Sequence, residues 1–229
     1  MTEATSYTQQ VTVIAVDGPA ASGKGTLARR LADKLGFAYL DTGKLYRYVG
    51  RCVLDHGGDP GDAATATAMA EHIRDRLHPA DLADHRLSGH AAGNAASKVA
   101  QFEGVRQALY DYQVTFAANP PDNAPGAVID GRDIGTVIAP DADIKLYITA
   151  SGEVRAQRRY QQLQFTREAT TYDTILQDMK ERDKRDSGRE SAPMQAAEDA
   201  FVIDTSDMDI ETAYNGVAEI VHNRLASHG

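Results

Sequence analysis

An apolar run followed at once by a glycine-rich loop constrains the fold of this chain more than any other feature. Residues 11–16 read VTVIAV, and residues 17–26 read DGPAASGKGT. A β-branched, nearly all-apolar run predicts a strand buried on both faces, as in a parallel sheet. From Lys24 onward, leucines recur at helical spacing until Gly36 ends the pattern. The opening therefore predicts a strand, a glycine loop and a helix.

The pattern from Gly18 to Thr26 fits a phosphate-binding loop, with Gly25 standing where the commonest form has serine or threonine directly after the lysine. Glycines let the backbone turn tightly, and the N-terminus of the next helix favours an anion. Lys24 can then reach the β- and γ-phosphates of ATP, and the Thr26 hydroxyl can ligate Mg²⁺. The predicted ATP-binding residues are Gly18, Pro19, Ala20, Ala21, Ser22, Gly23, Lys24, Gly25 and Thr26.

Strand and helix patterns alternate along the rest of the chain. Four further strands are predicted from short apolar runs at 37–40, 127–131, 143–149 and 200–205. Alternation of this kind predicts an α/β fold of the P-loop NTPase type, in which helices cover both faces of a five-stranded parallel sheet.

The distribution of charge bears on the class of ligand. The net charge of −9 disfavours nonspecific nucleic-acid binding, which needs many lysines and arginines. Residues 155–189, however, hold nine of the 24 basic residues and six acidic ones. A local positive zone on an acidic protein suits a small, highly charged anion. The alternative is a solvated helical face with i,i+4 ion pairs, and because Arg182 and Arg185 alternate with Asp183 and Asp186, we expect some of these charges to pair.

Other features bear on location and partners. The longest apolar runs are far shorter than the roughly 20 residues of a membrane span. Residues 1–10, which we expect to be a flexible N-terminus, lack the pattern of a secretion signal. Cys52 has no second cysteine with which to form a disulfide, and the seven histidines show no metal-ligand spacing. These observations predict a cytoplasmic protein with no membrane partner.

A set of motifs resembles one family. GPAASGKGT at 18–26 is similar to the phosphate loop of nucleoside monophosphate kinases, and the remaining motifs narrow the resemblance to bacterial cytidylate kinases. These are LDTGKLYR at 40–47, NAASKVA at 94–100, VRQAL at 105–109, DGRDIGT at 130–136, ERDKRDSGR at 181–189 and AEDAFVIDTSDMDIE at 197–211. Many NTPases share the glycine loop, whereas DGRDIGTV followed by KERDKRD is specific. The resemblance covers nearly the whole chain.

The resemblance implies an acceptor site for CMP or dCMP. Thr42 and Ser97 would offer hydroxyls to the base, and Asp133 would contact the sugar. The acceptor phosphate would face Arg47, Arg106 and Arg132, and Arg182 and Arg189 would complete the substrate-binding set. The catalytic cations would be Lys24, Arg132, Arg158, Arg182, Arg185 and Arg189. The arginines at 155, 158, 182, 185 and 189 would belong to a mobile lid and its flank, which closes over both phosphates and excludes water.

The implied reaction is ATP + (d)CMP to ADP + (d)CDP with Mg²⁺, a step of pyrimidine nucleotide metabolism. A nucleotide phosphate has a second pKa of about 6, so it is already an anionic nucleophile near neutral pH and needs no general base. Two alternatives stay open. A kinase acting on a hydroxyl of a sugar or shikimate would use Asp130 or Asp133 as its base. A noncatalytic nucleotide-binding regulator is the other, although Lys24 and the lid arginines are present.

The resemblance also implies a domain organisation. Residues 11–229 would form a single kinase unit with a core of 11–58 and 119–229, a helical nucleotide-binding insertion at about 59–118 and a short lid at about 155–170. Two departures bear on the acceptor: Lys44 stands where the family usually has alanine, and the segment 78–93 matches poorly and looks short. The preference among CMP, dCMP and UMP is therefore left open. We expect a monomer, because the enzyme must open and close around two substrates.

Overall fold

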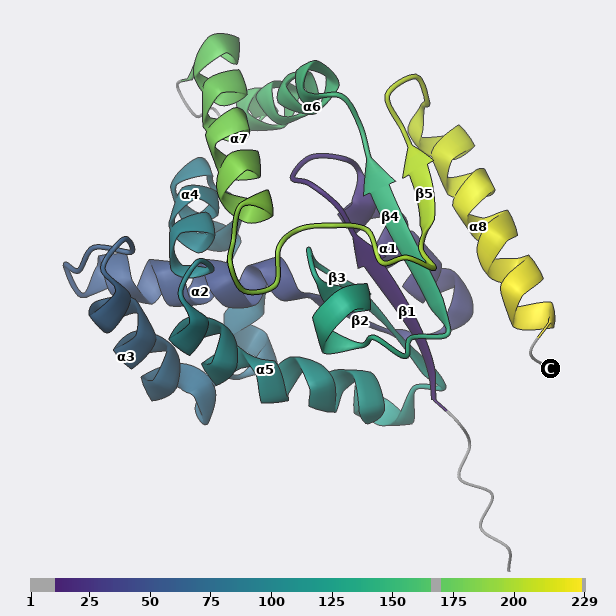
Figure 1. Cartoon of the computed structure of the whole chain (residues 1–229), viewed down its shortest axis with the longest axis horizontal. Coiled ribbons are helices and arrows are strands. Elements are labelled where there is room, and N and C mark those ends of the chain that lie inside the picture. The colour runs from purple at the N-terminus through teal and green to yellow at the C-terminus, as the bar shows by residue number, and fades with distance from the viewer. Residues whose placement is uncertain (1–10, 166–169, 228–229) are drawn as a thin grey trace, which may run out of the picture.

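The computed structural model describes residues 11–165 and 170–227. The predicted flexible N-terminus and residues 166–169 of the predicted lid lie outside this range. Five strands form one sheet in the order β2-β3-β1-β4-β5, and every neighbouring pair is parallel (Figure 1). The strands are β1 (Thr12–Asp17), β2 (Ala38–Asp41), β3 (Gly126–Asp130), β4 (Ile144–Thr149) and β5 (Phe201–Asp204). This confirms the predicted five-stranded parallel sheet.

Apolar residues of the central strands enter two different cores. Ile14 and Val16 of β1 face one core, where they meet α1 (Lys24–Leu35) and α8 (Ile210–Ala226). Ala15, between them, faces a larger core on the opposite side of the sheet. Because successive side chains of a strand point to opposite faces, a continuous apolar run fits only a strand that is covered on both sides.

The larger core is built by the long helical region between β2 and β3. Its helices are α2 (Thr42–Asp55), α3 (Ala63–Arg74), α4 (His90–Val99) and α5 (Glu103–Ala118). α2 and α4 approach closely at Gly50. A Cβ added at this position would lie only 2.8 Å from the Cβ of Ala95, so glycine is what allows the two helices to come this near. The predicted insertion thus contains α3 to α5, while α2, which comes before it, packs on α4.

Residues 79–93, where the sequence shows no clear pattern, begin as two short 3₁₀ helices, Pro79–Ala83 and His85–Ser88. Asp81 accepts a hydrogen bond from the His78 N–H, and Asp84 accepts one from the Arg86 N–H. Such local side-chain caps replace helical periodicity, since 3₁₀ turns seldom run beyond three or four residues. Two other short turns are Pro121–Asn123 and a π-helical turn, Ile134–Ile138.

The carboxyl ends of all five strands meet at one edge of the sheet, as they must in a parallel arrangement. The phosphate-binding loop follows β1 there, α2 begins there after β2, and the segment from Gly131 follows β3. Two more helices, α6 (Gly152–Phe165) and α7 (Tyr172–Ser187), extend over the same edge (Figure 1). The Ser151 hydroxyl accepts a hydrogen bond from the Val154 N–H at 3.3 Å and so caps α6. Ligands of open α/β sheets bind at this edge.

Across residues 11–165 and 170–227, none of the helices combines the length and the apolar character that crossing a membrane requires.

Candidate active site

The phosphate-binding loop has the backbone shape that its glycines predict. Gly18 has φ +141°, and a Cβ at this position would lie only 2.0 Å from the carbonyl oxygen of Ile148. Gly23 has φ +94° and is the N-cap of α1, where its carbonyl accepts hydrogen bonds from the N–H groups of Thr26 and Leu27. Only glycine fits the first position without moving β4. The loop therefore turns at the N-terminus of α1, the geometry that binds anions.

Lys24, in the first turn of α1, is paired with a carboxylate from β3. Its Nζ lies 2.9 Å from Oδ1 of Asp130, and the Tyr39 hydroxyl donates to Oδ2 of the same group at 3.2 Å. Burial lowers the pKa of Lys24 and raises the pKa of Asp130, while the attraction between the two opposes both shifts. A Cβ on Gly25 would lie 2.9 Å from Oδ2 of Asp130. Glycine at this position therefore avoids a steric clash with the Asp130 carboxylate.

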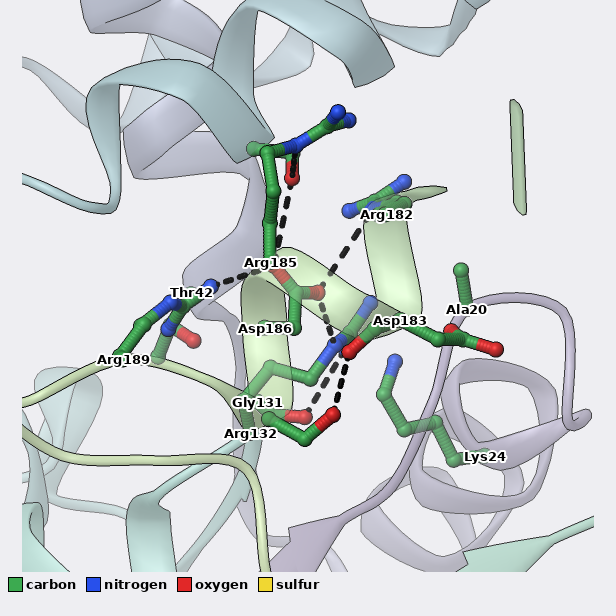
Figure 2. A network of polar contacts seen from close by, with 12 residues as sticks. Ala20, Lys24, Thr42, Gly131, Arg132, Arg182, Asp183, Arg185, Asp186 and Arg189 are labelled. Atoms are coloured by element: carbon green, nitrogen blue, oxygen red, sulfur yellow. Dashed lines mark hydrogen bonds and ion pairs between the residues drawn. The ribbon is translucent and has the colours of Figure 1, made fainter. Parts of the chain in front are cut away.

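Three arginines converge on Asp186 of α7 (Figure 2). The distances from guanidinium nitrogen to carboxylate oxygen are 3.3 Å for Arg132, 3.7 Å for Arg182 and 2.6 Å for Arg189. Asp186 is buried, which raises its pKa, but the three cations overcome this and hold the pKa below its usual value. Burial, followed by repulsion from Arg132, lowers the pKa of Arg182 to about 9. One carboxylate thus opposes three cations, an imbalance that an anionic ligand would relieve.

This group of charges joins three parts of the fold. Arg132 follows β3, Arg182 and Asp186 lie four residues apart on α7, and Arg189 follows the helix. The Ser97 hydroxyl on α4 donates to Asp186 at 3.2 Å and accepts from Nε of Arg185 at 3.2 Å. α7 is therefore tied both to the segment after β3, which carries Arg132, and to the helical insertion.

The other residues predicted to bind the acceptor form hydrogen bonds or ion pairs with one another or with nearby backbone carbonyls. The Thr42 hydroxyl donates to the carbonyl of Asp130 at 2.9 Å, and Arg106 pairs with Asp133. Arg47 donates to the carbonyl of Leu87 at 2.7 Å, and burial, with Arg159 nearby, lowers its pKa to about 10. Its hydrogen bonds go to carbonyls and, among the described residues, only the nearby Asp41 offsets its charge, so Arg47 can receive an anionic group.

The structure brings all the predicted substrate-binding residues to one cavity, which Lys24 also lines. They are Thr42, Arg47, Ser97, Arg106, Arg132, Asp133, Arg182 and Arg189. A second cavity lies on the other side of the phosphate loop and is lined by Gly23, Thr26, Arg158, Thr205, Met208 and Ile210. Ala21 lines both cavities. The phosphate loop therefore borders both cavities.

Three of the predicted lid arginines, Arg155, Arg158 and Arg185, do not line the first cavity. Arg185, predicted as a catalytic cation, instead donates from its Nε to the Ser97 hydroxyl. Arg158 donates to the carbonyl of Thr205 at 2.6 Å and to that of Ser22 at 3.3 Å, beside the second cavity. Arg155 pairs with Asp183 at 2.7 Å and reaches the carbonyl of Ala20 at 3.3 Å, which ties α6 to α7 and to the phosphate loop.

Sequence reasoning missed the shared partner of the three arginines, the contact that Lys44 makes and the contacts of Asp17. Asp186 was expected only to pair with neighbouring charges, and its spacing of four from Arg182 and three from Arg189 is the signal that marks it as their shared partner. Lys44 donates to the carbonyl of Leu82 at 2.9 Å, so it fastens the 3₁₀ segment to α2 at the cavity wall. Asp17, at the end of β1, had no signal beyond being an acidic residue after an apolar strand.

The residues near the phosphate loop fit Mg²⁺. This ion is held in kinases by one or two protein oxygens together with substrate phosphates. The exposed Thr26 hydroxyl and the Asp130 carboxylate are donors of that kind. Within 11–165 and 170–227, histidine, cysteine and carboxylate side chains form no group of three that could hold a metal ion.

Comparison with known proteins agrees with this geometry. The family model for cytidylate kinase matches residues 14–223. A cytidylate kinase of Rhodospirillum rubrum is 55% identical over 93% of this chain and 98% of its own length. A cytidylate kinase of Caulobacter vibrioides is 53% identical over 94% and 98%. A crystal structure of an uncharacterized protein from Eubacterium ventriosum, 14% identical, has a TM-score of 0.52 over 92% of this chain and 98% of its own, a likeness of fold alone. The chain therefore belongs to the cytidylate kinase family of nucleoside monophosphate kinases.

Proposed function

We propose that this protein transfers the γ-phosphoryl group of ATP to the phosphate of CMP or dCMP, forming ADP and CDP or dCDP, and that it requires Mg²⁺. The observation that carries this proposal is the shared cavity of Lys24, Arg132 and Arg182, three cations from three segments of the chain. Phosphoryl transfer passes through a highly anionic transition state, so catalysis is mainly positioning and neutralisation of charge. Guanidinium groups suit this task because they grip phosphate in bidentate fashion.

The phosphate loop would bind the phosphates of ATP, and the second cavity would receive its nucleoside. Lys24 would leave or share Asp130 to reach the transferring phosphate. Mg²⁺, held by Thr26 with Asp130 nearby, would neutralise charge on the ATP phosphates. A monomer fits this scheme, because α6 and α7 must open and close around two nucleotides.

The acceptor would lie in the first cavity. The hydroxyls of Thr42 and Ser97 would contact its base, and Asp133 its sugar. Arg47, Arg106 and Arg132 would hold the acceptor phosphate, whose second pKa of about 6 makes it an anionic nucleophile at neutral pH. No proton has to be removed in this reaction. The two carboxylates that could act as a base are engaged, Asp130 with Lys24 and Asp133 with Arg106, which favours a phosphate acceptor over a hydroxyl acceptor.

An acceptor panel tests this proposal. ADP release from MgATP would be measured with CMP, dCMP, UMP, AMP, GMP, shikimate and gluconate, beside a reaction without acceptor. We expect CMP and dCMP to be used far better than the others. Faster ADP release with shikimate or gluconate would contradict the proposal and reassign Asp130 or Asp133 as a base.

The hydroxyls of Thr42 and Ser97 should determine the affinity for the acceptor. Replacing either residue with alanine should raise KM for CMP about two- to tenfold, the effect of one hydrogen bond, and leave KM for ATP unchanged. Steady-state kinetics with each substrate varied in turn would measure both constants. Thr115→Ala, at an exposed position of α5, is the control. An effect on ATP alone would show that these residues do not line the acceptor site.

A further inference from the structure

Asp17 joins the strand that carries the phosphate loop to the segment that carries the acceptor residues. Its Oδ1 accepts a hydrogen bond from the N–H of Ile134, and its Oδ2 accepts one from the N–H of Gly135, both at 2.8 Å. The residue is 4% exposed. Both oxygens are therefore committed to one short stretch of backbone, which lies far away in the sequence.

Each end of this connection lies next to residues that are predicted to bind a substrate. The residue after Asp17 is Gly18, which is held closely against the carbonyl of Ile148. The residues just before Ile134 are Arg132 and Asp133, the predicted contacts of the acceptor phosphate and sugar. A shift of the 134–135 backbone would therefore move these two side chains relative to the phosphate loop.

We propose that Asp17 is a positioning residue for phosphoryl transfer: by accepting two backbone hydrogen bonds, it holds Arg132 and Asp133 at a fixed place relative to the phosphate loop. It does not touch either substrate. This inference rests on the proposed function, because it takes CMP as the acceptor and these two residues as its contacts.

The substitution Asp17→Asn tests this role with little change of shape. An amide has one acceptor oxygen, and its NH₂ group would face the second backbone N–H, donor against donor. A buried donor without a partner costs about 1–3 kcal/mol. We therefore expect the backbone at 134–135 to shift in this variant. Asp143→Asn is a matched control. The Asp143 carboxylate also accepts a hydrogen bond from β1, from the N–H of Val13 at 2.8 Å, but at the opposite end of the strand from the site.

We expect Asp17→Asn to raise KM for CMP about tenfold, equivalent to about 1.4 kcal/mol, while the affinity for ADP measured by titration stays within about twofold. Asp143→Asn should leave both values unchanged. A role limited to folding would reduce the fraction of active protein, and with it kcat, without changing KM. An unchanged KM for CMP in Asp17→Asn would overturn the inference. If the wild-type protein does not phosphorylate CMP at all, the proposed function itself fails and the inference fails with it.

The pH dependence gives a second readout. Burial raises the pKa of Asp17 to about 7, against the two backbone hydrogen bonds that lower it. The charged or titratable groups around it are Asp130, Asp133, Tyr147 and Lys145, whose side chain passes Gly135. Protonation below pH 7 removes one acceptor, so KM for CMP in the wild type should rise as pH falls. The ratio of this KM to that of Asp17→Asn cancels the titration of CMP itself, and a ratio independent of pH would contradict the inference.

If Asp17→Asn does not fold, the inference can be tested by NMR on the wild-type protein. The amide signals of Ile134 and Gly135 in ¹⁵N–¹H spectra should shift with pH, with a midpoint near the pKa of Asp17, and should move when CMP is added. The amide of Val13, bound to Asp143, is the internal control and should not respond to CMP. Amides at 134 and 135 that ignore CMP would overturn the inference.

Discussion

Replacing Lys24 with alanine should lower kcat for phosphoryl transfer by about 10²–10³-fold, the usual effect of removing one preorganised group that meets developing charge. Lys24 belongs to the phosphate loop itself, and its ammonium group lies 2.9 Å from Oδ1 of Asp130. No other residue of α1 can replace it, because the first turn carries no second basic side chain. The loss should appear chiefly in kcat, since developing charge is greatest in the transition state.

Single-turnover measurements with MgATP and saturating CMP would measure this effect without interference from product release. Lys34→Ala is the matched control, because Lys34 lies on the same helix and is exposed at its C-terminal end. It should react at the wild-type rate. Near-normal transfer by Lys24→Ala would mean that the glycine loop does not hold the transferring phosphate.

Replacing Asp186 with alanine should lower the free energy of unfolding by about 3–5 kcal/mol, the range for breaking a buried ion pair from one side. The carboxylate is 2% exposed and is shared by Arg132, Arg182 and Arg189. Without it, three half-buried cations would repel one another. KM for CMP should also rise, because the Ser97 hydroxyl would lose the group to which it donates.

Urea unfolding of Asp186→Ala with and without inorganic phosphate would measure this effect. Because phosphate can take the place of the lost carboxylate, it should stabilise the variant more than the wild type. The control is Asp173→Ala, at an exposed position in the first turn of the same helix, where a change of at most about 0.5 kcal/mol is expected. Equal stability of Asp186→Ala and the wild type would show that the arginines do not depend on this carboxylate.

The architecture could be predicted from the sequence because local patterns determine it. The run VTVIAV, the glycine loop and the leucine spacing from Lys24 indicate one strand–loop–helix unit, and repeated alternation indicates the sheet. The secondary structure of the segment 79–93 could not be predicted from the sequence. Its 3₁₀ turns, capped by Asp81 and Asp84, are too short to produce a periodic pattern of apolar residues.

Partners within the site could not be predicted, because distant parts of the chain supply them. Asp17 meets the N–H of Ile134, 117 positions away, and Arg132 meets Asp186 54 positions away. The motifs that carry the family resemblance contain most of the residues that line the first cavity. The roles of Asp17 and Asp186 depend on where backbone and side chains lie after folding.

The most direct test of the account is to identify the product by ³¹P NMR. Wild-type protein would be mixed with MgATP and CMP, and the spectrum would be followed to equilibrium. We predict that the CMP signal falls while the α- and β-phosphate signals of CDP appear, in step with ADP. The appearance of inorganic phosphate without CDP, or an unchanged CMP signal, would contradict the assignment of the arginine-lined cavity as the acceptor site.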